Sequence, residues 1–210
     1  PIGRDYTRGL LGLDQRQQAE EQFQELSANR SAGMARFEAA DFTALQADAA
    51  LMELTMPAAR RLFQDNCAAC HGSEGNGGPG YPVLSDAYWI WGGDPAVIAE
   101  TIHLGINASG DETRLAQMPA FDWMEREEQA ALATYVAALP HGTADQTSPA
   151  ASLFADNCSS CHGDTAAGEL ENGAPSLTDA SIIYGQDYET ILQTLRHGRN
   201  GVMPSWADRL

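Results

Sequence analysis

Two short stretches of this chain bring cysteine and histidine together at a spacing that suits covalent attachment chemistry. Each has two cysteines separated by two residues and a histidine directly after the second: Cys67, Cys70 and His71, then Cys158, Cys161 and His162. A Cys-x-x-Cys-His run is the pattern of c-type haem attachment. Two thiols on one turn can bind the two vinyl groups of one porphyrin, while the histidine lies under the iron. The sequence therefore predicts two covalently attached haem c groups.

Other uses of paired cysteines fit the sequence less well. The two pairs of a structural zinc site usually lie within about 15–20 residues of each other, whereas a large part of this chain separates them. A thioredoxin-like redox pair lies between a strand and a helix, but no β-branched run precedes either motif and a glycine-rich loop follows both. The loop at 72–80 also lacks the strand and helix of a phosphate-binding loop. Repetition of the whole motif favours haem.

A methionine–proline pair follows each motif further along the chain and is a candidate for the second axial ligand. Met118 and Met203 both precede a proline, with an aromatic residue three positions after the methionine. A thioether is a soft, uncharged ligand that raises the potential of haem iron when it lies opposite histidine. Core packing is the alternative role for a methionine. Recurrence in register favours iron ligation by both.

The remaining methionine–proline pair and histidines are weaker candidates. Met56 also precedes a proline, but it lies before the first motif, and a proline at the first position of a helix explains this pair. His103 and His197 do not recur at matching positions of the two copies, and His141 lies in the connecting segment. We expect these three histidines to form hydrogen bonds or to lie on the surface.

The segments around the two motifs repeat each other. Residues 62–67 match 153–158, and residues 80–87 match 173–180. Four spaced positions also match: Ile98, Thr101, Ile102 and Gly105 with Ile191, Thr194, Leu195 and Gly198. Two copies of one domain explain this pattern. The predicted organisation is a helical segment at 1–56, a first domain at 57–140, a linker at 141–149 and a second domain at 150–210.

Helical patterns precede the first motif. Asp14 is a candidate cap for a helix over residues 15–26. Residues 31–54 are rich in alanine and predict one or two more helices. A further helix, starting at Pro57, should lead into the first motif at Cys67. These helices would position the first pair of thiols.

The two ends of the chain indicate that it continues on both sides. After Met118, apolar residues at helical spacing predict a helix over residues 123–139. The chain ends seven residues after Met203, so we expect a matching closing helix beyond it. Pro1 is not a translation start, and no run of about 18 apolar residues spans a membrane within this sequence. A membrane anchor could therefore precede residue 1.

Charge narrows the range of partners. The 210 residues carry a net charge of −17 at pH 7, which excludes nucleic acid as a partner. An acidic surface would attract a cationic partner protein, and solubility is the alternative explanation for it.

Each half of the chain resembles a class I cytochrome c. The resemblance implies an all-α fold in which an N-terminal helix, the Cys-x-x-Cys-His turn, a loop and a C-terminal helix enclose the haem. In that family a proline after the motif accepts a hydrogen bond from the other ring nitrogen of the ligand histidine. Pro82 and Pro175 stand at this place. Such a bond would orient the histidine ring and tune the iron.

Nearly the whole chain resembles the dihaem subunit, subunit III, of cbb3-type cytochrome c oxidases. The resemblance rests on residues 9–13, the helical segment before the first motif, the tandem motifs and residues 198–206. Leu13 stands where this family usually has tryptophan. The resemblance implies an electron-transfer subunit, not an enzyme by itself, anchored in the bacterial inner membrane with its haem domains in the periplasm.

The same resemblance implies the partners. Electrons would come from a cytochrome c or a cytochrome bc1 complex and pass to the catalytic subunits of the oxidase. The complex would also contain a monohaem cytochrome c subunit. Oxygen reduction and proton translocation would be carried out by subunits other than this one. A free periplasmic dihaem carrier is one alternative. A dihaem peroxidase is another, but it needs an iron with an exchangeable site, and two methionine ligands would leave none.

Two pairings of histidine with methionine are open. Pairing within each copy would join His71 to Met118 and His162 to Met203. The resemblance implies the crossed arrangement instead, His71 with Met203 and His162 with Met118, and two packed domains can exchange arms in this way. The additional residues 107–117 would lengthen the segment that carries Met118, so that it could extend to the other domain. We prefer the crossed pairing.

Overall fold

The computed structural model describes residues 14–179 and 183–207 of the chain. Contacts divide the chain into two compact units, Pro1–Leu62 and Phe63–Leu210, each described by itself below. Both Cys-x-x-Cys-His motifs and both candidate methionines lie in the second unit. Residues 9–13, which carry part of the resemblance to the oxidase subunit, and the last residues of the chain, 208–210, lie outside the described residues.

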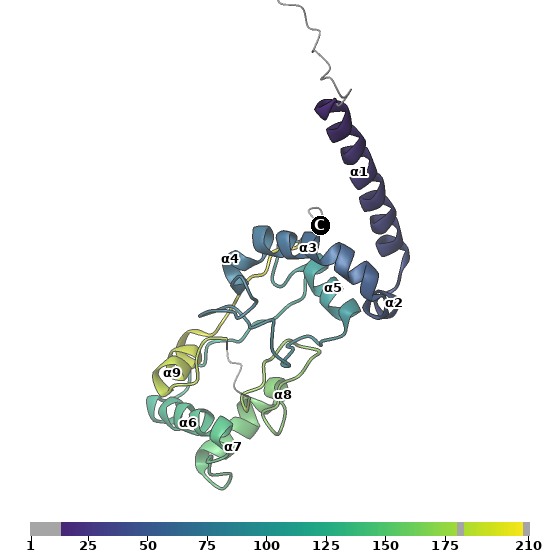
Figure 1. Ribbon diagram of the computed structural model, residues 1–210. Helices are drawn as coiled ribbons and strands as arrows, with labels where there is room; N and C mark the ends of the chain where they lie inside the picture. The colour runs from purple at the N-terminus through teal and green to yellow at the C-terminus, as the bar shows by residue number, and fades with distance from the viewer. Residues whose placement is uncertain (1–13, 180–182, 208–210) are drawn as a thin grey trace, which may run out of the picture. The chain divides into compact units, whose positions relative to one another are not determined.

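Capping aspartates start the helices of the first unit. The helices are α1 (Gln15–Ala39), α2 (Phe42–Ala47) and α3 (Ala49–Asn66), the last of which continues into the second unit (Figure 1). The Asp14 carboxylate accepts hydrogen bonds from the backbone N–H of Arg16 at 3.0 Å and of Gln17 at 3.2 Å. The predicted cap is therefore confirmed. The helix runs beyond residue 26, so α1 includes the start of the alanine-rich segment.

Pro57 lies inside α3, and the prediction that it starts a helix is wrong. The helix begins at Ala49 because the carboxylate of Asp48 accepts a hydrogen bond from Leu51 N at 2.9 Å. A proline in a helix interior removes one backbone hydrogen bond and costs about 3 kcal/mol. Leu51 and Thr55, which precede Pro57 in the same helix, are buried.

The second unit is helical apart from its long connecting loops. Its elements after α3 are α4 (Ala68–His71), α5 (Pro95–Leu104), α6 (Arg126–Ala138), the 3-10 turn η1 (Leu139–His141), α7 (Pro149–Asn157), α8 (Ser159–His162) and α9 (Tyr188–His197). Across residues 14–179 and 183–207, extended segments pair only as isolated bridges. The predicted all-α class is therefore confirmed for this part of the chain.

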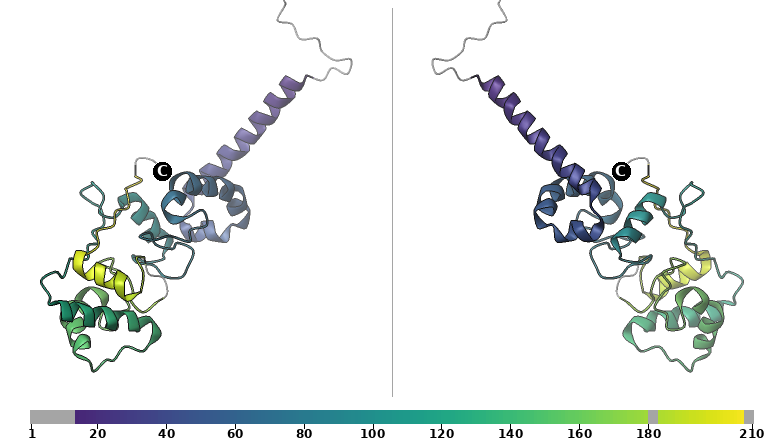
Figure 2. Two further views of the ribbon diagram at one scale, coloured as in Figure 1. Left: turned by 90° about the vertical axis from the view of Figure 1, so that its left-hand side faces the viewer. Right: turned by 90° about the vertical axis from the view of Figure 1, so that its right-hand side faces the viewer.

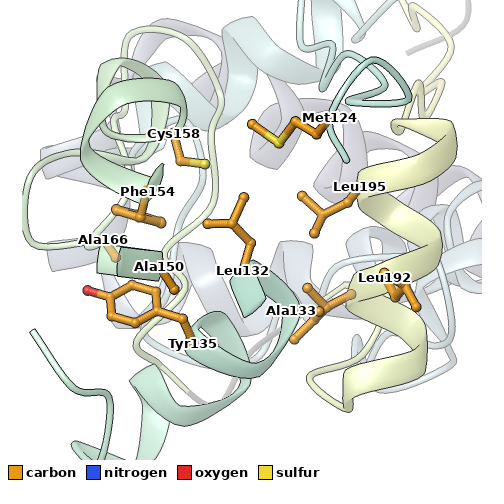
Figure 3. Close-up of a cluster of buried hydrophobic side chains, with 11 residues drawn as sticks. Met124, Leu132, Ala133, Tyr135, Ala150, Phe154, Cys158, Ala166, Leu192 and Leu195 are labelled. Carbon is orange, nitrogen blue, oxygen red and sulfur yellow. The ribbon is translucent and has the colours of Figure 1, made fainter. Parts of the chain in front are cut away.

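The core of the second unit lies where α6 packs against α7 and α9 (Figures 1 and 2). Leu132 of α6 is fully buried there, next to Phe154 of α7 and Leu195 of α9. In Figure 3, Leu132, Met124 and Leu195 face the Cys158 thiol across the centre of this cluster. The helix that follows Met118 in the chain thus covers helices of the second copy.

The predicted helix over residues 123–139 forms as α6, but three residues later at its start. Glu125 and Glu128 form a capping box, in which each side chain accepts a hydrogen bond from the backbone of the other. This box satisfies two backbone donors that a helix start otherwise leaves free. Trp123 stays outside the helix and is 66% exposed.

The matching helices of the two copies, α5 and α9, begin and end alike. Asp94 and Asp187 cap their starts, and Gly105 and Gly198 end them with φ of +71° and +66°. A side chain is disfavoured at such angles, which explains glycine at both positions. The repeat seen in the sequence is therefore a repeat of backbone geometry. No helix within the described residues is long and apolar enough to span a membrane.

Candidate haem sites

Both Cys-x-x-Cys-His motifs form the same tight helical turn. In the first, the backbone N–H groups of Cys70 and His71 donate to Cys67 O at 3.1 and 2.9 Å. In the second, Cys161 and His162 donate to Cys158 O at the same distances. Each pair of thiols therefore lies on one turn, as attachment to a single porphyrin requires.

All four cysteines are free thiols. Burial, and secondly the nearby Cys161 thiol, raises the pKa of Cys158 to about 11. Burial, and then Cys70, also raises the pKa of Cys67. Both groups are therefore uncharged at neutral pH. Among the described residues, no group of three or more histidines, cysteines or carboxylates gathers as a metal cluster.

A proline carbonyl holds each motif histidine by its Nδ1 atom. The distance is 3.1 Å from His71 Nδ1 to Pro82 O and 2.9 Å from His162 Nδ1 to Pro175 O. A carbonyl only accepts, so Nδ1 carries a proton, and in the neutral form of the ring Nε2 then keeps its lone pair free. Burial lowers the pKa of His162, against the smaller opposite effect of Pro175. The ring is therefore a neutral imidazole, which is the form that binds iron.

Glycines bring the proline loops close to the histidines. A Cβ at Gly77, where φ is +68°, would lie 2.7 Å from Tyr81 O and 2.9 Å from Val83 N. At Gly168, with φ of +85°, it would lie 2.7 Å from Ala174 O and Ser176 N. Only glycine permits this approach. The sequence indicates where these loops lie, but the role of the two glycines follows only from the structure.

Met203 lies against the first copy of the repeat. Its backbone N–H donates to Ile106 O at 2.9 Å, and Ile106 N donates to Met203 O at 2.8 Å. Three residues later, Trp206 N donates to Ile102 O of α5 at 3.0 Å. The segment that contains Met203 is therefore paired with the end of the first copy's helix, although Met203 belongs to the second copy.

Met118 makes the matching contacts with the second copy. Its backbone exchanges hydrogen bonds with Arg199 at 3.0 and 2.9 Å, and Phe121 N donates to Leu195 O of α9 at 2.7 Å. The half-buried Met118 side chain packs against the buried cluster that contains Cys158. Each methionine arm thus lies on the copy to which it does not belong in sequence.

The other candidate ligands lie elsewhere. The side chains of His103, His141 and His197 are exposed, at the ends of α5, η1 and α9 respectively. Met56 lies within α3 in the first unit and is 36% exposed. These positions agree with the surface roles expected for the three histidines.

Two buried donors of the first copy lack a hydrogen-bond acceptor in the part of the chain that the structure describes. Trp91 Nε1 and Arg114 Nε are buried and have no hydrogen-bond partner within the described residues. An unsatisfied buried donor costs about 1–3 kcal/mol. A haem propionate would supply an acceptor, and its negative charge would suit the Arg114 guanidinium, so the residues fit this cofactor. Neither donor was singled out from the sequence, although Arg114 and Arg199 each lie four residues before a candidate methionine.

Comparisons with known proteins agree with this geometry. Residues 57–140 match the family described as "Cytochrome c". Residues 145–210 match the family described as "Cytochrome C oxidase, cbb3-type, subunit III". These two matches cover both motifs and both methionine–proline pairs.

Relatives match over the whole chain. The cbb3-type cytochrome c oxidase subunit CcoP of Azospirillum sp. (strain B510) is 36% identical over 100% of this chain and 75% of its own length. The subunit FixP of Azorhizobium caulinodans is 38% identical over 100% of this chain and 73% of its own length. The CcoP subunit of Cereibacter sphaeroides is 35% identical, with 100% and 74% covered. The chain therefore belongs to the CcoP/FixP family of cbb3-type cytochrome c oxidase subunits.

Proposed function

We propose that the chain binds two haem c groups and transfers electrons as a dihaem subunit of a cbb3-type oxidase. The observation that carries this proposal is the hydrogen bond from Nδ1 of each motif histidine to a proline carbonyl, formed alike by His71 and His162. Bound haem c supplies a one-electron iron couple. The described residues provide thioether attachment and oriented histidine rings with Nε2 free for iron.

We assign the axial methionines in the crossed arrangement, Met203 to the iron of His71 and Met118 to the iron of His162. Two observations support this assignment. Met203 pairs with Ile106 at the end of the first copy's helix, and Met118 packs against the cluster around Cys158. Neither methionine needs to leave these contacts to serve the copy on which it lies. Exchange of arms between two like domains is a known form of swapping.

The partners and location belong to the same proposal. Electrons arrive from a cytochrome c or a bc1 complex and pass to the catalytic subunits of the oxidase. The family's names, which all specify oxidase subunits, support this route over a free periplasmic carrier. We place the haem domains on the periplasmic side of the bacterial inner membrane, held by an anchor that precedes residue 1.

Haem counting tests the dihaem assignment. The intact subunit should contain two covalent haems by mass spectrometry, and replacing Cys67 and Cys70 by serine should remove one of them. Ferrous carbon monoxide titration should show slow, weak binding at both irons, because a histidine and a methionine would hold each iron and leave no exchangeable position. Rapid binding at one iron would favour a peroxidase-like site instead.

Replacing each methionine in turn tests the crossed ligation. Met118→Ala should remove the sulfur ligand from the haem on Cys158 and Cys161, and Met203→Ala from the haem on Cys67 and Cys70. The readout is the ferric sulfur-to-iron absorption, with each haem assigned by paramagnetic NMR. If each substitution affects the haem of its own copy, the arms are not exchanged and only the crossed assignment fails.

A further inference from the structure

An aromatic ring of the first copy lies on the proline loop of the second. A Cβ added at Gly173 would contact Trp91 Cζ2, and it would lie 2.8 Å from Cε2 and 2.9 Å from Cη2 of the same ring. Gly173 lies two residues before Pro175, whose carbonyl accepts the His162 Nδ1 hydrogen bond. The indole ring therefore occupies the space that a side chain at Gly173 would need. Its contact is with the backbone that positions the His162 acceptor.

A ring of the second copy takes the matching place on the first. Tyr184 Cε1 would lie 3.7 Å from a Cβ at Gly80, and Gly80 N donates to Ile183 O at 2.8 Å. Gly80 lies two residues before Pro82, which accepts from His71. Trp91 and Tyr184 are equivalent in the repeat, each five residues after the aspartate of its copy, Asp86 or Asp179. The contact between copies is therefore reciprocal.

An arginine covers each ring. The guanidinium carbon of Arg114 lies 4.9 Å from the centre of the Trp91 ring, and that of Arg199 lies 4.3 Å from the centre of the Tyr184 ring. Each arginine is itself held by a side chain. Arg114 pairs with Glu100 at 2.6 Å, and Arg199 Nε donates to Thr194 Oγ1 at 2.9 Å. Such cation–π contacts restrain the ring as well as stabilise it.

We propose that Trp91 and Tyr184 are reciprocal positioning residues, each of which supports the proline loop that orients the haem-ligating histidine of the opposite copy. The inference rests on the proposed function, because it concerns the haem ligands. A cavity of about 320 Å³ shows the proximity directly. It is lined by Tyr81 and Pro82 of the first copy and by Ile183 and Tyr184 of the second.

The same arginines also connect to the methionine arms. Arg199, which covers Tyr184, exchanges backbone hydrogen bonds with Met118. Arg114, which covers Trp91, pairs through its backbone with the segment at Gly105 and Ile106, and Ile106 pairs with Met203. A single chain of contacts thus joins the methionine arm of one haem to the histidine loop of the other.

The expected electronic effect has a definite sign. A hydrogen bond from Nδ1 makes the imidazole more electron-rich, which stabilises the ferric state and lowers the potential. Trp91→Ala frees the loop at Gly173 and weakens the bond from His162 to Pro175. The potential of the haem on Cys158 and Cys161 should then rise. A tenfold change in its reduction equilibrium corresponds to about 59 mV for one electron.

The experiment is a potentiometric titration of the intact dihaem subunit, with each haem assigned by paramagnetic NMR. Trp91→Ala should raise the potential of the haem on Cys158 and Cys161 by up to about 59 mV, which is a tenfold change in its reduction equilibrium. Tyr184→Ala should raise the potential of the haem on Cys67 and Cys70. The Tyr184 effect should be smaller, since its contact with Gly80 is looser. Trp91→Phe, which retains a ring, should give an intermediate shift and supplies the measurement if the alanine variant folds poorly.

Trp123→Ala is the matched control, because this tryptophan is 66% exposed and should leave both potentials unchanged. Unchanged potentials in the Trp91 and Tyr184 variants, with both haems attached, would overturn the inference and leave the proposed function intact. A shift confined to the haem of the substituted residue's own copy would also overturn it. Absence of covalent haem in the unsubstituted protein would instead contradict the proposed function.

Discussion

Replacing Gly105 by alanine should detach the Met203 arm from the first copy of the repeat. The new Cβ would lie 2.6 Å from both Met203 O and Ser205 N, and ordinary contact begins at about 3.4 Å, so the arm must retreat by about 0.8 Å. This movement breaks the two hydrogen bonds between Ile106 and Met203, at 2.8 and 2.9 Å.

The size of the effect follows from these contacts. Two neutral hydrogen bonds contribute about 2 kcal/mol net, which is a factor of roughly 30 between the docked and detached arm. The backbone at Gly105, with φ of +71° and ψ of −176°, lies in a region essentially restricted to glycine, so an alanine there costs about 1–3 kcal/mol more, and this part lowers the stability of the fold as a whole. Under the crossed assignment, the iron of His71 then loses its sulfur ligand, and its potential falls.

The assay is the ferric sulfur-to-iron absorption together with the midpoint potential of each haem in the intact subunit. Gly198→Ala is the mirror experiment, because its Cβ would lie 2.9 Å from Ala120 N beside Met118, and it should affect the haem of His162. Gly110→Ala is the control, since nothing lies within 4 Å of a Cβ there. Retention of both sulfur ligands in the Gly105 and Gly198 variants would refute the reasoning from close approach.

Three further predictions concern the stability of the fold and the electrostatic attraction of a cationic electron donor. Leu132→Ala should lower the free energy of unfolding by about 2–5 kcal/mol, because Leu132 is 0% exposed in the core; denaturant titration measures this, and a loss below about 1 kcal/mol would contradict the packing. Hydrogen bonds from Thr190 lower the pKa of Asp187 in the folded state. The ionised carboxylate therefore stabilises the fold fully above the ordinary pKa of aspartate, and this stabilisation is lost as pH falls through the lowered pKa. In Asp187→Asn, the free energy of unfolding should depend less on pH over this range, as measured by denaturant titration at each pH. The rate of electron delivery from a cationic donor should fall as salt screens the net charge of −17, and a rate independent of ionic strength would leave the acidic surface a role in solubility only.

Local patterns predicted the parts of the fold that local energetics control. The cap at Asp14, the helix after Met118 and the turns at the two motifs depend on residues close in sequence, and they form as expected. The start of the helix before the first motif was wrong. Pro57 is a good first residue of a helix, but the cap at Asp48 and the packing of Leu51 start α3 earlier.

The candidate site was partly predictable for the same reason. The cysteines and histidines stand at short, repeated spacings, and the resemblance to class I cytochromes c implied the hydrogen bonds found at Pro82 and Pro175. The supporting residues were not predictable in this way. Trp91 and Tyr184 repeat in register, but what each ring contacts depends on a loop about 80–100 residues away, and propensity and periodicity carry no information on such contacts.

The sequence by itself determined the chemistry of this protein, because a Cys-x-x-Cys-His turn places its thiols and imidazole through backbone hydrogen bonds within five residues. It also determined that this motif occurs twice. Only the tertiary structure decided which methionine arm lies on which copy. Met118 and Met203 stand in equivalent places, so the sequence pattern is the same for either pairing. The difference lies in the backbone bonds from Met118 to Arg199 and from Met203 to Ile106, which form between segments that only packing of the two copies brings together.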